Sequence, residues 1–433
     1  MSIPSVVSAG ASRARPDAVR VAAPWRLGTI MAAPHRLGFL AAALVMSASA
    51  IWWCVELILR QLGAGSLAVA VPASFVHAVL MTYGFMPLFF SGFLFTAGPR
   101  WLQMPEGEAN TIRPGVMALL MGWCAWLIGA RWHAGVAALG AVLAAIGWGW
   151  LAVHFSRLVR QSPARDKVHG TVVMVASWVG VAGLLLTAAG VALGRFDCLR
   201  WATWLGLWWF VVPVYVAVAH RMIPFFTAAV VPALDAWRPN WLLWSMQAAA
   251  GLQGLWFVLD AVGLDGTGWS VVRAFSSIVI GALLLALAVR WGLVQSLSVR
   301  LLAMLHIGFM WLGITFLLDG ANAIQQVMGL TTASHLAALH ALTMGFLGSV
   351  LIAMATRVSC GHGGRTLAAD NIAWSLFWLV QLAVVLRVAS AWWGAHAGVG
   401  LLAASGVWTT AVVGWSVRYG RWFGRPRLDG RPG

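Results

Sequence analysis

The sequence predicts an all-α membrane protein, a polytopic bundle of about twelve transmembrane helices. Of its 433 residues, 61% are hydrophobic and only 9% are charged, whereas soluble domains carry about 25% charged residues. Apolar runs of roughly 20 residues, long enough to cross the hydrocarbon core of a bilayer as helices, recur along the whole chain. This composition excludes soluble enzymes, secreted disulfide scaffolds, disordered chains and transcription factors.

The first apolar run follows an arginine-rich segment. It is too long for a signal peptide and is followed by many similar runs, so we interpret it as a membrane helix. The twelve predicted spans start near residues 37, 70, 114, 133, 171, 200, 241, 269, 301, 334, 372 and 396. We expect a basic cytoplasmic leader (1–36), one transmembrane helical domain (37–417) and a basic cytoplasmic tail (418–433).

The formal net charge of +16 would suggest nucleic-acid binding in a soluble protein. Here the basic residues lie mostly between apolar runs. Of the 28 Lys and Arg residues, Arg387 lies within a span, five lie on one side of the membrane and the remaining 22 lie on the side of the termini. The five are Arg60, Arg131, Arg195, Arg200 and Arg273. Positive charge marks the cytoplasmic side, so we expect a multi-pass protein of the bacterial inner membrane with both termini cytoplasmic, and no nucleic-acid partner.

Ionisable side chains inside the spans are costly, so each one is a candidate for function or internal pairing. They are Glu56, His77, Asp260, His306, Asp319, His340 and Arg387. We expect Asp260 and Asp319 at outer helix ends, where they can be hydrated. Arg387, deep in the eleventh span, requires a carboxylate, carbonyl groups or an acid group of a cofactor; an ion pair with Glu56 is an equal alternative.

His77 in the second span and His340 in the tenth lie at similar depth below the outer surface. Axial ligation of a haem requires two histidines placed in this way on different helices. The surrounding sequences resemble each other, because Met81 and Met344 each follow four residues later on the same helix face, with a glycine and a phenylalanine close by. The glycines would let a flat ring approach. Alternatively, the histidines are hydrogen-bonded in a tight interface and the glycines serve helix packing.

Four further histidines fall at the cytoplasmic end of the predicted fold: His35, His220, His306 and His362. Together they could bind a metal, or they could bind the acid groups of a cofactor with the neighbouring arginines. Alternatively, these residues have no specific ligand. They would then only add positive charge on the cytoplasmic side and cap the C-terminal ends of helices.

Four separated blocks resemble the NnrS family of membrane proteins. They are Pro34–Leu37 (PHRL), Pro87–Trp101 (PLFFSGFLFTAGPRW), Arg221–Thr227 (RMIPFFT) and His340–Arg365 (HALTMGFLGSVLIAMATRVSCGHGGR). The resemblance covers the chain from about residue 34 to the last span. It implies a twelve-span inner-membrane protein that contains haem b and copper and takes part in nitric oxide metabolism or protection against nitrosative stress during denitrification. It implies no defined catalytic reaction, and no catalytic residue is assigned.

This chain departs from the family pattern at two places. Val79 and Leu80 stand where many members have His and Glu, and Gly363 replaces a Thr, so a second metal ligand next to His77 is missing. The architecture also resembles the large subunit of haem-copper oxidases, which has twelve spans and places haem-ligand histidines on the second and tenth. The copper histidines of those subunits have no match here, which argues against oxygen reduction.

Two function classes remain open. In the first, the protein binds haem between the second and tenth spans with His77 and His340 as ligands, Met81 and Met344 beside the ring, and Arg387 near its acid groups. Nitric oxide is the expected ligand, with a quinone or another redox partner. In the second, a transporter moves a small ligand or a metal such as copper along a His- and Met-lined path. A scaffold without a cofactor is a third, purely structural alternative.

Overall fold

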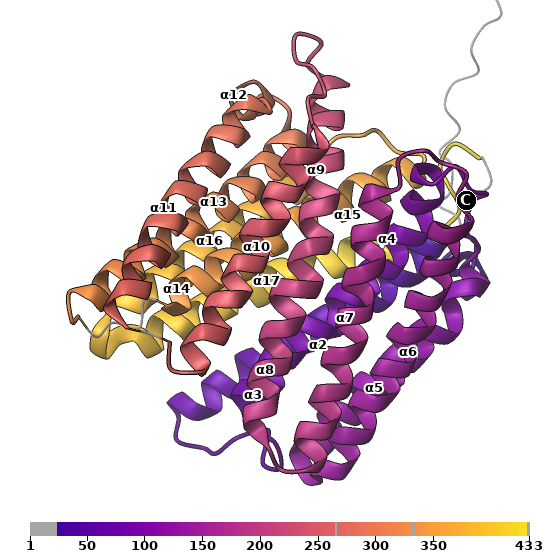
Figure 1. The fold of residues 1–433 in the computed structure, drawn as a ribbon. Helices are drawn as coiled ribbons and strands as arrows, with labels where there is room; N and C mark the ends of the chain where they lie inside the picture. The colour runs from indigo at the N-terminus through magenta and orange to yellow at the C-terminus, as the bar shows by residue number, and fades with distance from the viewer. Residues whose placement is uncertain (1–23, 265, 331–334, 431–433) are drawn as a thin grey trace, which may run out of the picture.

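The structure, a computed structural model, describes residues 24–264, 266–330 and 335–430. These residues form helices and connecting loops without strands, and twelve of the helical segments are long and apolar enough to span a membrane (Figure 1). In chain order the spans are α2 (Pro34–Gln61), α3–η1–α4 (Ala73–Trp101), α5 (Ala109–Trp132), α6 (Ala134–Gln161), α7 (Val168–Ala192), α8–η2–α9 (Phe196–Ala228), α10 (Asn240–Ala261), α11 (Thr267–Arg290), α13 (Arg300–Val327), α14–η3–α15 (Leu336–His362), α16–η4 (Asn371–Trp392) and η5–α17 (Gly394–Phe423). Two short helices are α1 (Leu27–Ile30) and α12 (Leu293–Ser296).

The fold class and the number of spans predicted from the sequence are confirmed. Each predicted start lies within five residues of the observed one, and the largest difference is at the third span, predicted at 114 and observed at Ala109. The closely spaced third and fourth runs are two separate helices, α5 and α6, with a single residue, His133, between them. Most of the expected leader, residues 1–23, lies outside the described residues, as does the end of the expected tail, residues 431–433.

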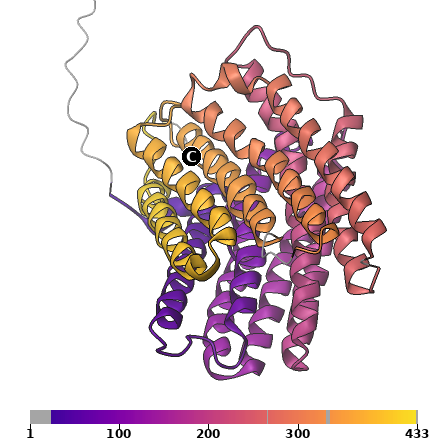
Figure 2. The same cartoon turned by 90° about the vertical axis from the view of Figure 1, so that its left-hand side faces the viewer.

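The two ends of the described chain lie at the same end of the bundle, as an even number of spans requires (Figure 1). The backbone N–H of Arg26 donates to the carbonyl of Gly424 at 2.8 Å. The Arg36 guanidinium donates to the carbonyls of Phe423 at 3.0 Å and Arg425 at 2.6 Å. The first and last spans are also neighbours, because α17 packs against α2 as well as α16 (Figure 2).

Every fourth span contains a π-helical segment. These segments are η1 (Leu80–Gly84) between α3 (Ala73–Val79) and α4 (Phe85–Trp101), η2 (Leu207–Val211) between α8 (Phe196–Gly206) and α9 (Val212–Ala228), and η3 (Ala341–Gly348) between α14 (His335–His340) and α15 (Ser349–His362). The second, sixth and tenth spans that carry them are 83%, 72% and 72% buried in their most apolar windows, against 33% for the eighth and twelfth. The π-helical spans therefore form the centre of the bundle, and π-helical turns often accompany functional sites.

Glycines bring α5 and α6 into backbone contact. A Cβ atom added at Gly140 would lie 2.5 Å from the backbone nitrogen of Trp126 and 2.6 Å from the carbonyl oxygen of Gly122. Small residues of this kind allow close approach of membrane helices, where van der Waals packing drives association.

We expect Gly140→Ala to destabilise the protein by about 1–3 kcal/mol, because the new methyl group must push two backbones apart. The matched control is Gly149→Ala on the same helix, where the nearest atom to an added Cβ is Val181 Cγ2 at 4.0 Å. That change should be neutral or stabilising, since alanine favours the helix by roughly 0.5–1 kcal/mol over glycine. Thermal unfolding in detergent measures both; equal shifts would contradict the packing argument.

Candidate functional site

A cavity of about 410 Å³ lies between the central spans, near the end of the bundle opposite the termini. We call it the histidine cavity. His77 and His340 both line it, together with Met81, Met344 and Arg387. Further wall residues come from the first, sixth and twelfth spans: Trp53, Thr203, Leu207, Ala404, Ser405 and Trp408. The structure thus brings all five residues of the predicted cofactor set to one cavity, of the size that small-molecule and cofactor sites have.

The hydrogen bond of His340 defines which ring nitrogen is free. Its Nδ1 lies 2.8 Å from the carbonyl oxygen of Leu336, one turn earlier on α14. A carbonyl can only accept, so Nδ1 carries the proton and Nε2 keeps its lone pair. Metal-ligating histidines are commonly oriented by such a bond from the other ring nitrogen to a backbone carbonyl. His340 is therefore held in the tautomer that can act as a ligand through Nε2.

The His77 ring is oriented by an aromatic neighbour. It stacks on Trp53 of α2 with ring centroids 4.1 Å apart and planes 20° from parallel. Its Nδ1 is buried and has no hydrogen-bond partner among the described residues. A buried polar atom without a partner costs free energy unless a ligand, an ion or water satisfies it. The second span therefore presents a histidine that is positioned by packing but unsatisfied.

All three π-helical segments of the described chain contribute to the wall of this cavity. Met81 belongs to η1, Leu207 to η2 and Met344 to η3. His77 lies three residues before η1 and His340 directly before η3. The repeated His-Ala-x-x-Met pattern thus corresponds to a repeated local structure, an α-helix that changes to a π-helix just after the histidine.

Arg387 lies in the last turn of α16 (Asn371–Ala389) and not deep in its span. Its side chain is buried, its Nη1 donates to Ser390 Oγ at 3.3 Å, and its Nε has no partner among the described residues. The alternative ion pair with Glu56 is not formed, because Glu56 accepts from Arg60 Nε at 2.7 Å. The Glu56 carboxylate also accepts from the backbone N–H of Leu67. Arg387 thus faces the cavity as a buried cation with unused donors.

The glycines after the two motifs serve helix packing. A Cβ atom on Gly345 would lie 2.6 Å from the Trp311 ring, and one on Gly84 would lie 3.4 Å from Val45 Cγ1. Both glycines therefore face neighbouring helices. The expectation that they admit a flat ring is not supported by these contacts, whereas the packing alternative is.

The four histidines near the termini do not meet in one group. His35 and His362 form a pair with ring centroids 4.6 Å apart. His306 Nε2 lies 2.9 Å from Thr227 Oγ1, and His220 belongs to a different pair. Among the residues that the structure describes, no group of three or more His, Cys, Asp or Glu side chains could hold a metal ion. Packing between helices separates residues that share only their depth in the membrane.

The partner of His220 is His169, which we did not single out from the sequence. His169 Nε2 lies 3.0 Å from His220 Nδ1, and His220 Nε2 lies 3.2 Å from the carbonyl oxygen of Pro239. Since the carbonyl accepts, His220 is protonated at Nε2 and His169 donates to its Nδ1. The sequence gives only a weak indication of this pair, namely that both histidines lie close to the termini end of adjacent spans.

The fold and the site define a class: a polytopic twelve-helix membrane protein with a buried two-histidine cavity suited to a cofactor or small ligand. The family model described as "NnrS protein" matches residues 29–427. The chain therefore belongs to the NnrS family, as the sequence blocks predicted, and is a membrane protein related to the nitric oxide response. This family is associated with haem and copper. A search of curated proteins found no match to the chain.

Proposed function

We propose that the protein binds one b-type haem in the histidine cavity and handles nitric oxide in the bacterial inner membrane. His77 and His340 would hold the haem iron as ligands, and Met81 and Met344 would line the site beside it. The observation that carries this proposal is the meeting of both histidines in one cavity, with the Nε2 of His340 left free by its bond to Leu336.

The residues present fit a haem in three ways. The cavity walls are mainly apolar side chains, which suits a macrocycle. The Nδ1 of His77 and the Nε of Arg387 are buried donors or acceptors without partners among the described residues. An arginine of this kind can neutralise a propionate through charge-assisted hydrogen bonds. When bound, the haem would supply an iron centre for electron transfer and for nitric oxide binding.

Copper has no comparable fit. No cluster of three or more His, Cys, Asp or Glu side chains occurs in the described part of the chain, and His35 and His362 form only a pair. We therefore derive no role for copper. Met354, a third methionine suited to soft copper, lines a separate apolar cavity of about 50 Å³ and does not extend the histidine cavity.

The proposed orientation places both termini in the cytoplasm. The support is the 22-to-five distribution of basic residues, together with the structural finding that both ends of the described chain lie at one end of the bundle. The histidine cavity would then lie near the outer surface of the inner membrane. A quinone or another redox partner would exchange electrons with the haem.

The reduced-minus-oxidised spectrum of the purified protein tests the proposal, with a pyridine haemochrome assay for haem type. We expect the b-type bands of a low-spin haem with two histidine ligands. Nitric oxide should shift the Soret band by displacing one of these histidines. Protein without haem would overturn the proposal. Copper flux into proteoliposomes by that haem-free protein would favour the transporter alternative.

Arg387→Leu should lower the haem-to-protein ratio, because it removes the cation proposed to hold a propionate. Arg387→Lys keeps a cation and should therefore retain part of the bound haem. The loss of a supporting residue at such a site costs about 10–100-fold in affinity. Arg195→Leu is the control, since Arg195 pairs with Asp197 at 2.8 Å on the same end of the bundle with two-thirds of its side chain exposed. Equal haem content in all three variants would contradict the role of Arg387.

A further inference from the structure

A second, larger cavity of about 990 Å³ lies beside the histidine cavity. We call it the polar cavity. Its rim is exposed and lies at the helix ends opposite the termini, at Arg200, Asp260, Gln326 and Leu330. Its floor is buried, and Trp208, Gln253 and Ala338 lie there at 4%, 5% and 6% exposure. The cavity therefore leads from the surface of that end into the bundle.

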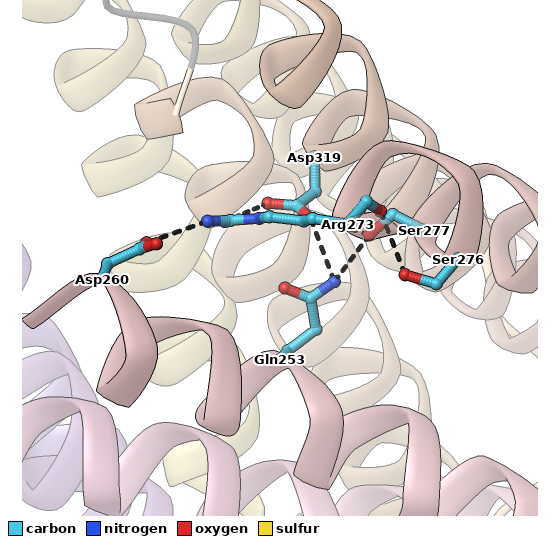
Figure 3. A network of polar contacts seen from close by, with 6 residues as sticks. All are labelled: Gln253, Asp260, Arg273, Ser276, Ser277 and Asp319. Atoms are coloured by element: carbon cyan, nitrogen blue, oxygen red, sulfur yellow. Dashed lines mark hydrogen bonds and ion pairs between the residues drawn. The ribbon is translucent and has the colours of Figure 1, made fainter. Parts of the chain in front are cut away.

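An ionic network holds one wall of the polar cavity. Figure 3 shows the Arg273 guanidinium between two carboxylates: its Nη2 donates to Asp319 Oδ1 at 2.6 Å and its Nη1 to Asp260 Oδ2 at 3.0 Å. Asp319 Oδ2 also accepts from Ser277 Oγ at 2.8 Å and from Gln253 Nε2 at 3.1 Å. The network joins α10, α11 and α13. Asp319 is thus buried and fully bonded, and not at a hydrated helix end as its sequence position suggested.

The charged side chains in its wall favour water in the polar cavity. Charged or polar groups that face an empty space would be costly. A polar space of this volume has room for many waters. An aqueous filling therefore suits the polar cavity.

Only a thin wall separates the two cavities. Leu339 lines both of them, and it directly precedes His340 on α14. On the sixth span, the neighbours Leu207 and Trp208 face the histidine cavity and the polar cavity respectively. The polar cavity thus ends against the side chain next to a candidate ligand histidine.

We infer that the polar cavity is the aqueous access route to the histidine cavity, for small neutral molecules that arrive from the end opposite the termini, and that Leu339 is the partition they pass. The histidine cavity is the same site as in the proposed function. The inference itself rests on the two cavities and needs no cofactor.

Cysteine labelling tests the first half of this inference. In a background with Cys54, Cys124, Cys198 and Cys360 replaced, Leu339→Cys should react with a membrane-impermeant methanethiosulfonate. It should react only from the side that also labels Leu62→Cys, a 73% exposed reference at that end. Ala337→Cys is the matched control on the same helix, since Ala337 is fully buried and lines neither cavity. An unreactive Leu339→Cys, or labelling from the termini side, would overturn the inference.

A second arm tests the partition. Ser405 lines the histidine cavity, and Ser405→Cys should react with methyl methanethiosulfonate, a small neutral reagent, added in water. Adding Leu339→Trp should slow this reaction at least tenfold, and adding Leu339→Ala should accelerate it. Leu264→Trp, an exposed change at the same end, should leave the rate unchanged. Equal rates in all backgrounds would mean that molecules reach the histidine cavity through the lipid. Because labelling does not depend on haem, a haem-free protein could still confirm the route, and a haem protein could still disprove it.

Discussion

We expect His340→Ala to abolish the low-spin haem spectrum of the purified protein, and His77→Ala to do the same. Each change removes one of the two axial ligands proposed for the histidine cavity. His396→Ala is the matched control, because His396 is exposed at the same end of the bundle and lies outside the cavity. Absorption and electron paramagnetic resonance spectra measure the result.

A variant that keeps the ligand but removes its support separates ligation from packing. Trp53→Leu leaves His77 in place without its stacking partner. Loss of such support at a metal centre lowers affinity about 10–100-fold, so haem should be retained less tightly with its low-spin spectrum intact. If both histidine variants keep unchanged bands, the ligands lie elsewhere. If the protein carries no haem and both histidines tolerate replacement, the scaffold alternative is favoured.

The second large effect is on stability. Arg273→Leu should lower the free energy of unfolding by about 3–5 kcal/mol, because it leaves the Asp319 charge buried without its counter-charge. The double variant Arg273→Leu with Asp319→Leu should recover most of this loss, since a buried ion pair can often be replaced by apolar residues at little cost. Unfolding in mixed detergent measures both.

The exposed pair of Arg195 and Asp197 provides the control. Their side chains are 66% and 47% exposed, against 14% and 9% for Arg273 and Asp319. Arg195→Leu should leave the stability nearly unchanged, because water screens an exposed pair. If Arg273→Leu were as mild, Asp319 would not depend on Arg273 as its counter-charge.

The sequence predicted the spans because a run of about 20 apolar residues is a local property, which needs no knowledge of neighbouring helices. It also indicated His77 and His340, since an ionisable group in a span stands out against a chain with 9% charged residues. Their shared depth followed from counting residues along two spans that run in the same direction through the membrane. The structure places both in one cavity.

Contacts between helices could not be predicted in the same way. His169 was passed over, although it forms a hydrogen bond with His220 at 3.0 Å. Asp319 was expected in water but is buried against Arg273. Such pairings depend on the rotation of each helix about its axis and on the choice of its neighbour. Neither quantity is contained in a pattern along one span.

The sequence by itself determined that this is a twelve-span membrane protein, with 22 basic residues on the side of its termini and two histidines at matching depth near the other side. The tertiary structure decided which of the polar side chains meet. It brought His77, His340 and Arg387 to one cavity, kept the four histidines near the termini apart, and set the polar cavity behind Leu339. The physical reason is that hydropathy sets the depth of a residue in the membrane, whereas only packing sets the direction in which it faces.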